Sequence, residues 1–506
     1  MVLRTLRTRC LFVVCAFVCF GGTSFEEGFC EEVLASDNFL VSESLFQDSP
    51  FESPGVGPAS TPRLETPTAT PTPAPPPVFV TSHGHGGKTL TSVFRPDYRE
   101  RLYIDTHIRP LYKVAQFRAL PRRFASRYGI STDRSTDSVC ADFDADGDME
   151  IAVSFGPGGK GTMFPSIVIV WSPFGEGDND PVPLTCKNVF CTKSPNPLLR
   201  NPHGAIRLTA GRFINPEDPP LLVAAQGVGG SNQIRLLRFL NRDGVSKMEI
   251  VGTIQGLTGR AAQGNGSGGT SVAAGDVDDD GLDELIVGQM NGEGAETYVQ
   301  VVDLEMDEER VRVAHRSTPV HGMREEFQGL GGVNLAVGDV LNEDGASHNE
   351  IIVASAGAID AEFHDPESGR VYRGGGYVDI LNVWAEPERG RVAEMTPTDR
   401  WLYRHPVLLY YPGDNPSGGL DIAAANVDFD EQDEFFLTTQ AILNLDRTTG
   451  EVTVSHSASV NLGVCIKFEE AWGKLSFWRC FGPHRMLIPA HAASSGALSV
   501  SAYGLD

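Results

Sequence analysis

Short apolar runs separated by glycine-rich and acidic turns recur along most of this chain. The clearest unit contains four such runs, at residues 270–274, 284–288, 298–304 and 310–315. Their short lengths, and the alternation of apolar and polar positions in the last run, indicate β-strands rather than helices. Four strands within about 65 residues predict one four-stranded blade of a β-propeller.

The third-strand pattern of this unit recurs at residues 166–171, 234–239 and 377–384, so the chain is an array of similar units. The 55 glycines and 33 prolines fit the many tight turns of an all-β array. A β-helix or a string of separate β-sandwiches is the alternative architecture, but the four-strand period favours blades.

The two ends of the array predict how it closes. Residues 78–94 have the pattern of a second strand, a glycine turn and a third strand, whereas residues 497–506 have the pattern of a first strand. We expect these segments to pair in one shared blade, which removes the exposed edges of an open array. Five complete units and the shared one predict six blades; seven blades is the alternative count.

An acidic stretch lies between the first and second strands of most units. Residues 142–150 and 276–284 are the regular copies, and residues 426–434 and 339–350 are looser ones. Residues 211–220 occupy the matching place without acids at the ligand positions. Carboxylates at alternate positions, with a glycine at the sharp turn, provide the oxygen ligands that a hard cation such as calcium requires.

Two other interpretations of the acidic stretches are an EF-hand and a turn that binds no metal. An EF-hand needs an acidic residue at position twelve between two helices, but that position is Val153 or Val287 and the flanking segments are strands. A metal-free turn would hold three mutually repelling carboxylates close together. Both arguments favour a cation site.

The best copies resemble a known repeat. Residues 269–288 and 141–154 are similar to FG-GAP/VCBS-type repeats, which occur in integrin α-chain propellers and in secreted bacterial proteins, and the resemblance extends over residues 78–506. It implies calcium ligands at loop positions one, three, five and nine, with a backbone carbonyl at position seven. The implied ligands are Asp142, Asp144, Asp146, Glu150 and the carbonyl of Asp148 in the first loop, and Asp276, Asp278, Asp280, Glu284 and the carbonyl of Leu282 in the second.

The chain departs from the repeat pattern in several places. Position nine is glutamate instead of aspartate, which lengthens that arm and allows bidentate contact. In the degenerate stretch Arg212 could supply a positive charge in place of a cation. We therefore expect two well-formed calcium sites of structural role and up to two more. The candidates for the latter are Asn426, Asp428, Asp430, Gln432 and Glu434, where Glu431 replaces the turning glycine, and Asp339, Asp344 and Glu350, where residues are inserted.

The N-terminal residues predict export. Arg4, Arg7 and Arg9 precede an apolar run at residues 11–20 that is too short to span a bilayer, so residues 1–24 are predicted to be a signal peptide, with a retained signal anchor as the alternative. Residues 25–77 are predicted to be disordered, acidic at first and then a Pro/Thr-rich linker. The propeller is predicted to occupy residues 78–506, and no other segment is predicted to cross a membrane.

Nine cysteines occur in the chain, and an exported protein can form disulfides. Two pairs are close in sequence, and we expect these to be the candidates for bonding: Cys186 with Cys191, and Cys465 with Cys480. Free buried thiols are the alternative for Cys30 and Cys140.

Charge and motifs limit the function. The net charge of −25 argues against nucleic acid or an anionic membrane as partner. The twelve histidines fall in no hydrolase, protease or kinase motif, and no catalytic residue is predicted. The chain is predicted to be a secreted or cell-surface calcium-binding module for adhesion to an extracellular protein or glycan, with residues 356–376 as one candidate contact surface. The alternative is an extracellular carbohydrate-active enzyme, a lyase or hydrolase, because the fold alone does not decide function.

Overall fold

The chain divides into two units, Met1–Ala69 and Thr70–Asp506, and every residue that the computed structural model describes lies in the second. The predictions for residues 1–24 and 25–77 fall outside the described residues. The described residues are 78–83, 90–96, 111–121, 137–155, 165–174, 181–191, 206–227, 230–242, 245–258, 269–290, 296–323, 332–340, 349–356, 362–364, 371–373, 378–386, 391–397, 420–426, 433–439, 442–445, 452–456, 460–469, 476–486 and 498–503.

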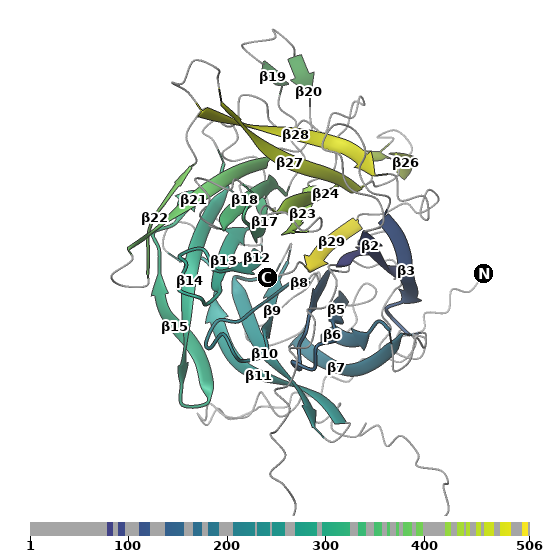
Figure 1. The fold of residues 1–506 in the computed structure, drawn as a ribbon. Coiled ribbons are helices and arrows are strands. Elements are labelled where there is room, and N and C mark those ends of the chain that lie inside the picture. The colour runs from purple at the N-terminus through teal and green to yellow at the C-terminus, as the bar shows by residue number, and fades with distance from the viewer. Residues whose placement is uncertain are drawn as a thin grey trace, which may run out of the picture. The chain divides into compact units, whose positions relative to one another are not determined.

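The regular elements among these residues are strands, and they form groups of four hydrogen-bonded neighbours (Figure 1). The group that joins the chain ends contains β29 (Leu498–Tyr503), β1 (Val78–His83), β2 (Leu90–Pro96) and β3 (Leu111–Arg118). The next contains β4 (Ser138–Ala141), β5 (Glu150–Phe155), β6 (Pro165–Ser172) and β7 (Val182–Cys191). The third contains β8 (Ile206–Gly211), β9 (Leu221–Gln226), β10 (Gln233–Arg242) and β11 (Val245–Gln255).

Three further groups complete the described strands. The fourth contains β12 (Thr270–Gly275), β13 (Glu284–Gln289), β14 (Tyr298–Asp307) and β15 (Arg310–Arg316), with β16 (Val320–His321) beside β14. The fifth contains β17 (Val333–Gly338), β18 (Glu350–Ser355), β21 (Val378–Glu386) and β22 (Arg391–Pro397), and the hairpin β19 (Glu362–His364) and β20 (Val371–Arg373). The sixth contains β23 (Leu420–Ala425), β24 (Glu434–Thr439), β27 (Val460–Glu469) and β28 (Ser476–Met486), and the hairpin β25 (Ile442–Leu445) and β26 (Val452–His456).

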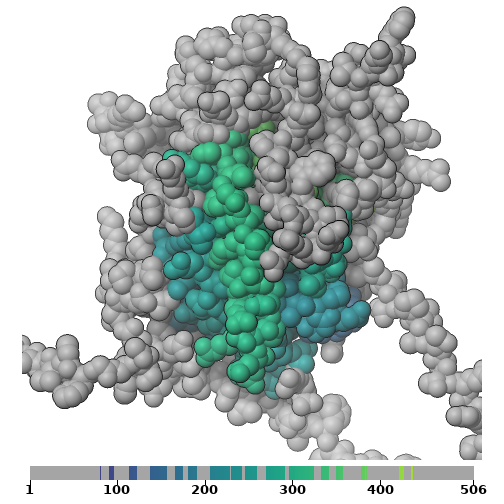
Figure 2. Space-filling model, turned by 90° about the vertical axis from the view of Figure 1, so that its left-hand side faces the viewer, coloured from purple at the N-terminus to yellow at the C-terminus, as the bar shows by residue number. Residues whose placement is uncertain are grey.

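The first strands of successive groups contact one another in order. β4 contacts β8, and the series continues through β12, β17, β23 and β29, which contacts β4 again. The third and fourth groups are also joined at their outer strands, where Gly252 of β11 and Val311 of β15 form a parallel pair. Figure 2 shows the green surface of β14 and β15 beside teal surface on this side of the molecule. The described fold is all-β and nearly closed, as in a β-propeller.

The chain ends pair as the sequence predicts. β29 runs antiparallel to β1, with a register from Val78 opposite Tyr503 to His83 opposite Leu498. β1 and β2 therefore occupy the second and third places of a sheet whose first strand comes from the C-terminal end.

The apolar second strands are buried on both faces, which explains why their sequences are continuous apolar runs. In β13, Leu285 and Val287 pack in a core with residues of β9, while Ile286 between them packs on the opposite face with Val333 of β17. The fourth sheet thus shares one core with the preceding sheet and another with the following one. Among the described residues no helix is long and apolar enough to span a membrane.

One of the two expected disulfides is wrong. Cys186 and Cys191 both lie in β7, and five strand residues span about 16 Å, well beyond the 4.4–6.8 Å between the Cα atoms of a disulfide. Cys186 is a free thiol, and burial raises its pKa to about 12. Cys140 is a buried residue. Cys465 and Cys480, in contrast, are direct partners in the register of β27 and β28.

We expect Cys465 and Cys480 to be linked when the protein is made in an oxidising compartment. Opposed Cα atoms of antiparallel strands lie about 4.5–5.5 Å apart, within the span of a disulfide. Peptide mapping without reduction should recover one linked peptide pair that separates on reduction, while Cys140 and Cys186 remain alkylatable after unfolding. Alkylation of Cys465 and Cys480 in the unreduced, unfolded protein would contradict the pairing.

Candidate metal centres

Two loops have the same backbone conformation. The first connects β4 to β5 and the second connects β12 to β13. Ala145 and Asp279, at the fourth position, both have φ of 59°, and Gly147 and Gly281, at the sixth, have φ of 91° and 86°. A Cβ atom at Gly281 would meet nothing within 4 Å, so the glycine is required by its left-handed backbone and not by lack of space.

In each loop, the carboxylates at positions one and five accept hydrogen bonds from backbone N–H groups of the same loop. In the first loop Asp142 Oδ2 accepts a hydrogen bond from the backbone N–H of Gly147 at 3.1 Å, and Asp146 Oδ1 accepts one from the N–H of Asp148 at 2.8 Å. The second loop repeats both bonds, from Gly281 to Asp276 and from Leu282 to Asp280, each at 2.9 Å. These hydrogen bonds support the same loop conformation at both places, and they come from side chains that the sequence predicts to be metal ligands.

The glutamate at position nine makes a contact that sequence reasoning missed. Its carboxylate turns back across the loop and accepts the backbone N–H of position two. The bond has a length of 2.9 Å from Phe143 to Glu150 and from Val277 to Glu284. It recurs at 2.9 Å from Val340 to Glu350, the glutamate that begins the second strand after the loop with inserted residues. The repeated occurrence of glutamate where aspartate was expected is the signal that could have predicted it.

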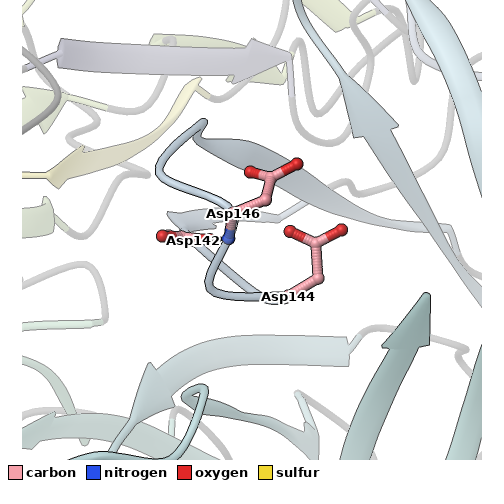
Figure 3. Close-up of side chains that lie close together, drawn as sticks. All are labelled: Asp142, Asp144 and Asp146. Carbon is pink, nitrogen blue, oxygen red and sulfur yellow. Dashed lines mark hydrogen bonds between the residues drawn. The ribbon is translucent and has the colours of Figure 1, made fainter. Parts of the chain in front are cut away.

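Carboxylate oxygens converge in both regular loops. In the first, one oxygen from each of Asp142, Asp144 and Asp146 lies within 4.8 Å of the others, and Figure 3 shows the three side chains on a single tight loop. In the second the converging set is Asp276, Asp278 and Glu284. Glu150 and Asp280 belong to the loops but not to these sets. The predicted carbonyl ligands of Asp148 and Leu282 stay predictions.

Several of these oxygens are buried without a hydrogen-bond partner among the described residues. They are Asp144 Oδ1, Asp276 Oδ1 and both carboxylate oxygens of Asp278. Buried polar atoms in folded proteins are nearly always paired, and an unpaired carboxylate oxygen is especially unfavourable. An oxygen-ligated cation would supply the missing partner, so the residues present fit such an ion.

The folded loops disfavour the ionised form of several of their carboxyl groups. Burial raises the pKa of Glu284 to about 10, and the charge of Asp278 adds to the shift. Burial likewise raises the pKa of Glu150 to about 9 and that of Asp278 to about 6, again with contributions from neighbouring carboxylates. A divalent cation favours the ionised carboxylates and would reverse these shifts.

The first loop also receives a contact from the next sheet. Asn241 of β10 donates its Nδ2–H to Asp144 Oδ2 at 2.9 Å. This bond opposes the rise in the pKa of Asp144 that burial causes. Asn241 therefore fixes one oxygen of Asp144 and leaves the other, Oδ1, available for a ligand.

The two looser loops are described only in part. Asp339 and Glu350 are buried residues at the ends of β17 and β18, and Asp344 between them lies outside the described residues. Asn426 follows β23 and the backbone of Glu434 begins β24. The remaining predicted ligands of that loop, Asp428, Asp430 and Gln432, lie outside the described part of the chain. Both additional sites stay predictions.

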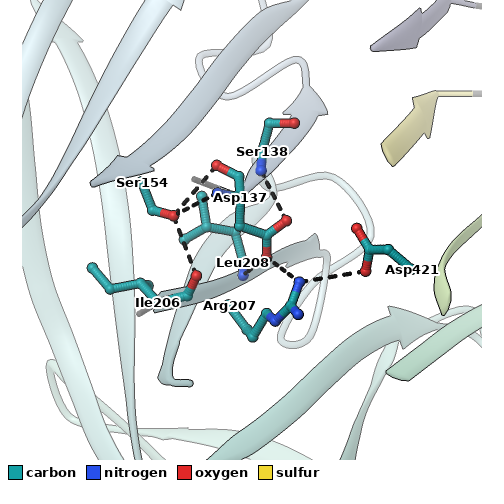
Figure 4. A network of polar contacts seen from close by, with 7 residues as sticks. All are labelled: Asp137, Ser138, Ser154, Ile206, Arg207, Leu208 and Asp421. Atoms are coloured by element: carbon teal, nitrogen blue, oxygen red, sulfur yellow. Dashed lines mark hydrogen bonds and ion pairs between the residues drawn. The ribbon is translucent and has the colours of Figure 1, made fainter. Parts of the chain in front are cut away.

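A second polar cluster joins the first strands of three sheets (Figure 4). Asp137, Arg207 and Asp421 occupy equivalent places, each four residues before the last register pair of its first and second strands. Arg207 Nη1 lies 3.4 Å from Asp421 Oδ1 and 3.9 Å from Asp137 Oδ2. Sequence reasoning missed this cluster, although opposite charges at one register position were a readable signal.

Backbone groups also engage Asp137. Its Oδ1 accepts the N–H of Ser138 and its Oδ2 accepts the N–H of Leu208, both at 2.9 Å. Leu208 belongs to β8, so the carboxylate bonds to the neighbouring sheet as well as to its own. We assign the cluster of Asp137, Arg207 and Asp421 a structural role, because its charges compensate one another.

Replacing Arg207 with methionine should lower the free energy of unfolding by about 1–2 kcal/mol, because Asp137 and Asp421 lose their shared cation in a largely buried setting. The side chains are only 19%, 10% and 12% exposed for Arg207, Asp137 and Asp421. Urea unfolding measures the change. Lys247→Met is the matched control, because Lys247 pairs with Glu249 on the surface and its loss should change stability by about 0.5 kcal/mol or less. Equal effects of the two substitutions would contradict the structural role.

Comparison with known proteins gives a family match for the second loop and the strands beside it. The model of the FG-GAP repeat matches residues 268–302, which span β12, the second loop, β13 and part of β14. No relative was found among the curated proteins. A solved structure of the rhamnogalacturonan lyase YesW is similar, with a TM-score of 0.30 and 13% sequence identity. The matched region covers 75% of this chain and 66% of the lyase chain, just under two thirds of the length of the lyase. The chain therefore contains an FG-GAP repeat at residues 268–302.

Proposed function

We propose that this protein is a secreted or cell-surface, calcium-binding β-propeller of six blades that binds an extracellular protein or glycan. The observation that carries the proposal is the pair of loops with matching backbones and converging, partnerless carboxylate oxygens. Calcium fits an all-oxygen ligand set on a loop, whereas magnesium demands a stricter octahedron and retains more water.

Calcium in this role is structural. The ligands in the first loop would be Asp142, Asp144 and Asp146, and in the second Asp276, Asp278 and Glu284. Bound there, the ion would neutralise buried carboxylates between the first and second strands. It would stabilise the folded state by mass action, without taking part in a reaction.

Six blades are supported by the circle of contacts among the first strands of the six groups and by the pairing of β29 with β1. Secretion is supported by the basic and apolar N-terminal pattern of residues 1–24 and by the FG-GAP repeat, which is typical of extracellular proteins. The partner surface includes residues 356–376, an insertion between β18 and β21 that contains the hairpin β19–β20.

The proposal is tested by applying the purified full chain to a printed glycan array and to a panel of extracellular proteins, in calcium and in chelator. Saturable binding that requires calcium, with the bound glycan unchanged over time, is the expected result. Cleavage of a bound glycan would assign the chain to the carbohydrate-active enzymes instead. Absence of binding, or binding that is equal in chelator, would contradict the proposal.

A further inference from the structure

The residue directly before a second strand contacts the loop of the preceding sheet. We call Asp283, Asn349 and Asp433 the latch residues; they precede β13, β18 and β24. Asp283 and Asp433 occupy position eight of their acidic loops; Asn349 lies in the loop with inserted residues, and each of the three directly precedes the glutamate that begins the second strand. The three junctions that they span are consecutive, because β8, β12, β17 and β23 are neighbours in that order.

Two latch residues make the same two-point contact. Asp283 Oδ2 accepts the backbone N–H of Arg212 at 2.5 Å, and the N–H of Asp283 donates to the carbonyl of Arg212 at 3.1 Å. Asp433 Oδ2 accepts the N–H of Asp339 at 3.1 Å, and its own N–H donates to the carbonyl of Asp339 at 2.7 Å. Both target residues stand at position one of the preceding loop, so the contact repeats by loop position.

The third latch residue also contacts position one of the preceding loop, but its side chain donates a hydrogen bond instead of accepting one. Asn349 Nδ2 donates to the carbonyl of Asp276 at 2.8 Å. Asp276 is position one of the second loop, where its side chain belongs to the converging carboxylates. An amide directly before the second strand therefore contacts position one without adding a negative charge beside it.

A glycine before position one makes room for the two acidic latch residues. A Cβ atom at Gly211 would lie 3.0 Å from Asp283 Oδ2, and one at Gly338 would lie 2.7 Å from Asp433 Oδ2. Side chains at these places would therefore push the carboxylate away from the backbone that it contacts. A Cβ atom would also lie 2.8 Å from Phe213 and 2.9 Å from Ala274 at Gly211, and 2.8 Å from Ala424 at Gly338, so the latch carboxylate is one of several close neighbours that favour glycine there.

The preceding junctions lack such a side chain. The residue before β5 is Met149 and the residue before β9 is Pro220. Methionine offers no strong acceptor and proline has no N–H, so neither can make the two-point contact. Among the junctions where the residue before the second strand is described, the latch is thus a property of three, and the identity of that residue indicates it.

We propose that Asp283 and Asp433 are positioning residues that join each acidic loop to the preceding sheet, and that Asp283 holds the loop at residues 211–220 in place without a cation. That loop has no carboxylate at positions one, three, five and nine, but it keeps the strand-loop-strand frame of β8 and β9. Charge-assisted bonds from a carboxylate to a backbone N–H are stronger than neutral ones, which suits this task. The inference is independent of calcium binding.

Hydrogen exchange of the full chain in chelator tests it. Asp283→Leu removes the acceptor at similar size, Asp283→Asn retains an acceptor oxygen, and Asp218→Asn is the control, since Asp218 is an exposed acid of the same loop. The Arg212 amide should exchange about tenfold faster in Asp283→Leu, as expected for the loss of one part-buried, charge-assisted hydrogen bond. Its exchange rate should return most of the way to that of the wild type in Asp283→Asn. Asp218→Asn should leave it unchanged.

If Asp283→Leu does not fold, the contact between Asp433 and Asp339 provides the same test. There Asp433→Leu should accelerate exchange of the Asp339 amide, and Asp433→Asn should restore its protection. Unchanged exchange at Arg212 and Asp339 in folded leucine variants would overturn the proposal. So would equal acceleration in the leucine and asparagine variants, because that would show that the acceptor oxygen is not what protects the amide.

Discussion

Replacing Glu284 with glutamine should stabilise the protein in chelator at pH 8 and destabilise it in calcium. The pKa of Glu284 rises on folding from 4.5 to about 10, mainly through burial. The stability that this group contributes is therefore fully present below about pH 4.5 and is lost as the pH rises through about 10. Glutamine is neutral at every pH and can still accept the Val277 N–H, so in chelator at pH 8 it should add about 2 kcal/mol.

In calcium the substitution should lower the stability instead of raising it, because glutamine removes a negative oxygen ligand from the second loop. Urea unfolding at pH 5 and pH 8, each with calcium and with chelator, measures all four cases. At pH 5 in chelator the variant and the wild type should differ little. Glu309→Gln, in the exposed turn between β14 and β15, is the control and should change stability by less than about 0.5 kcal/mol throughout. A variant less stable than wild type at pH 8 in chelator would contradict the account.

Ending the chain at residue 497 should destabilise the fold by about 5 kcal/mol or more, the range of total stability for many domains. The truncation removes β29, whose six residues pair with β1 and which contacts both β4 and β23. Without it β1 becomes an exposed edge and the circle of first strands opens. We expect a chain that aggregates or unfolds without a cooperative transition.

Thermal unfolding followed by circular dichroism measures the effect. The matched control ends at Tyr503, which keeps all of β29 and removes the three residues after it. That chain should unfold at the temperature of the full chain. If the chain ending at residue 497 also unfolds cooperatively at that temperature, β29 does not close the fold.

The strand array was predictable because burial on both faces leaves continuous apolar runs such as Leu285 to Val287, bounded by glycines. The partnership of β29 with β1 followed from a missing first strand at one end and a lone first strand at the other. Candidate ligands followed from local spacing, since Asp142, Asp144 and Asp146 are brought together by one turn alone.

Contacts between sheets could not be predicted from local sequence patterns in this way. The pairing of Arg207 with Asp421 joins residues 214 positions apart and depends on the closed order of the first strands. The bond from Asp283 to Arg212 depends on how two neighbouring loops meet. The expected link between Cys186 and Cys191 was wrong because nearness in sequence becomes distance along an extended strand, and no local pattern showed that β7 includes both residues.

Thermal unfolding of the full chain during calcium titration tests the central claim most directly. Starting from chelator, calcium should raise the melting temperature in a saturable way, because an ion that binds only the folded state adds about 2.7 kcal/mol at a concentration one hundred times its dissociation constant. The combined variant Asp144→Asn and Asp278→Asn should abolish most of the rise, and magnesium should give a smaller one. A melting temperature that is the same in chelator and in saturating calcium would contradict the assignment of the loops as calcium sites.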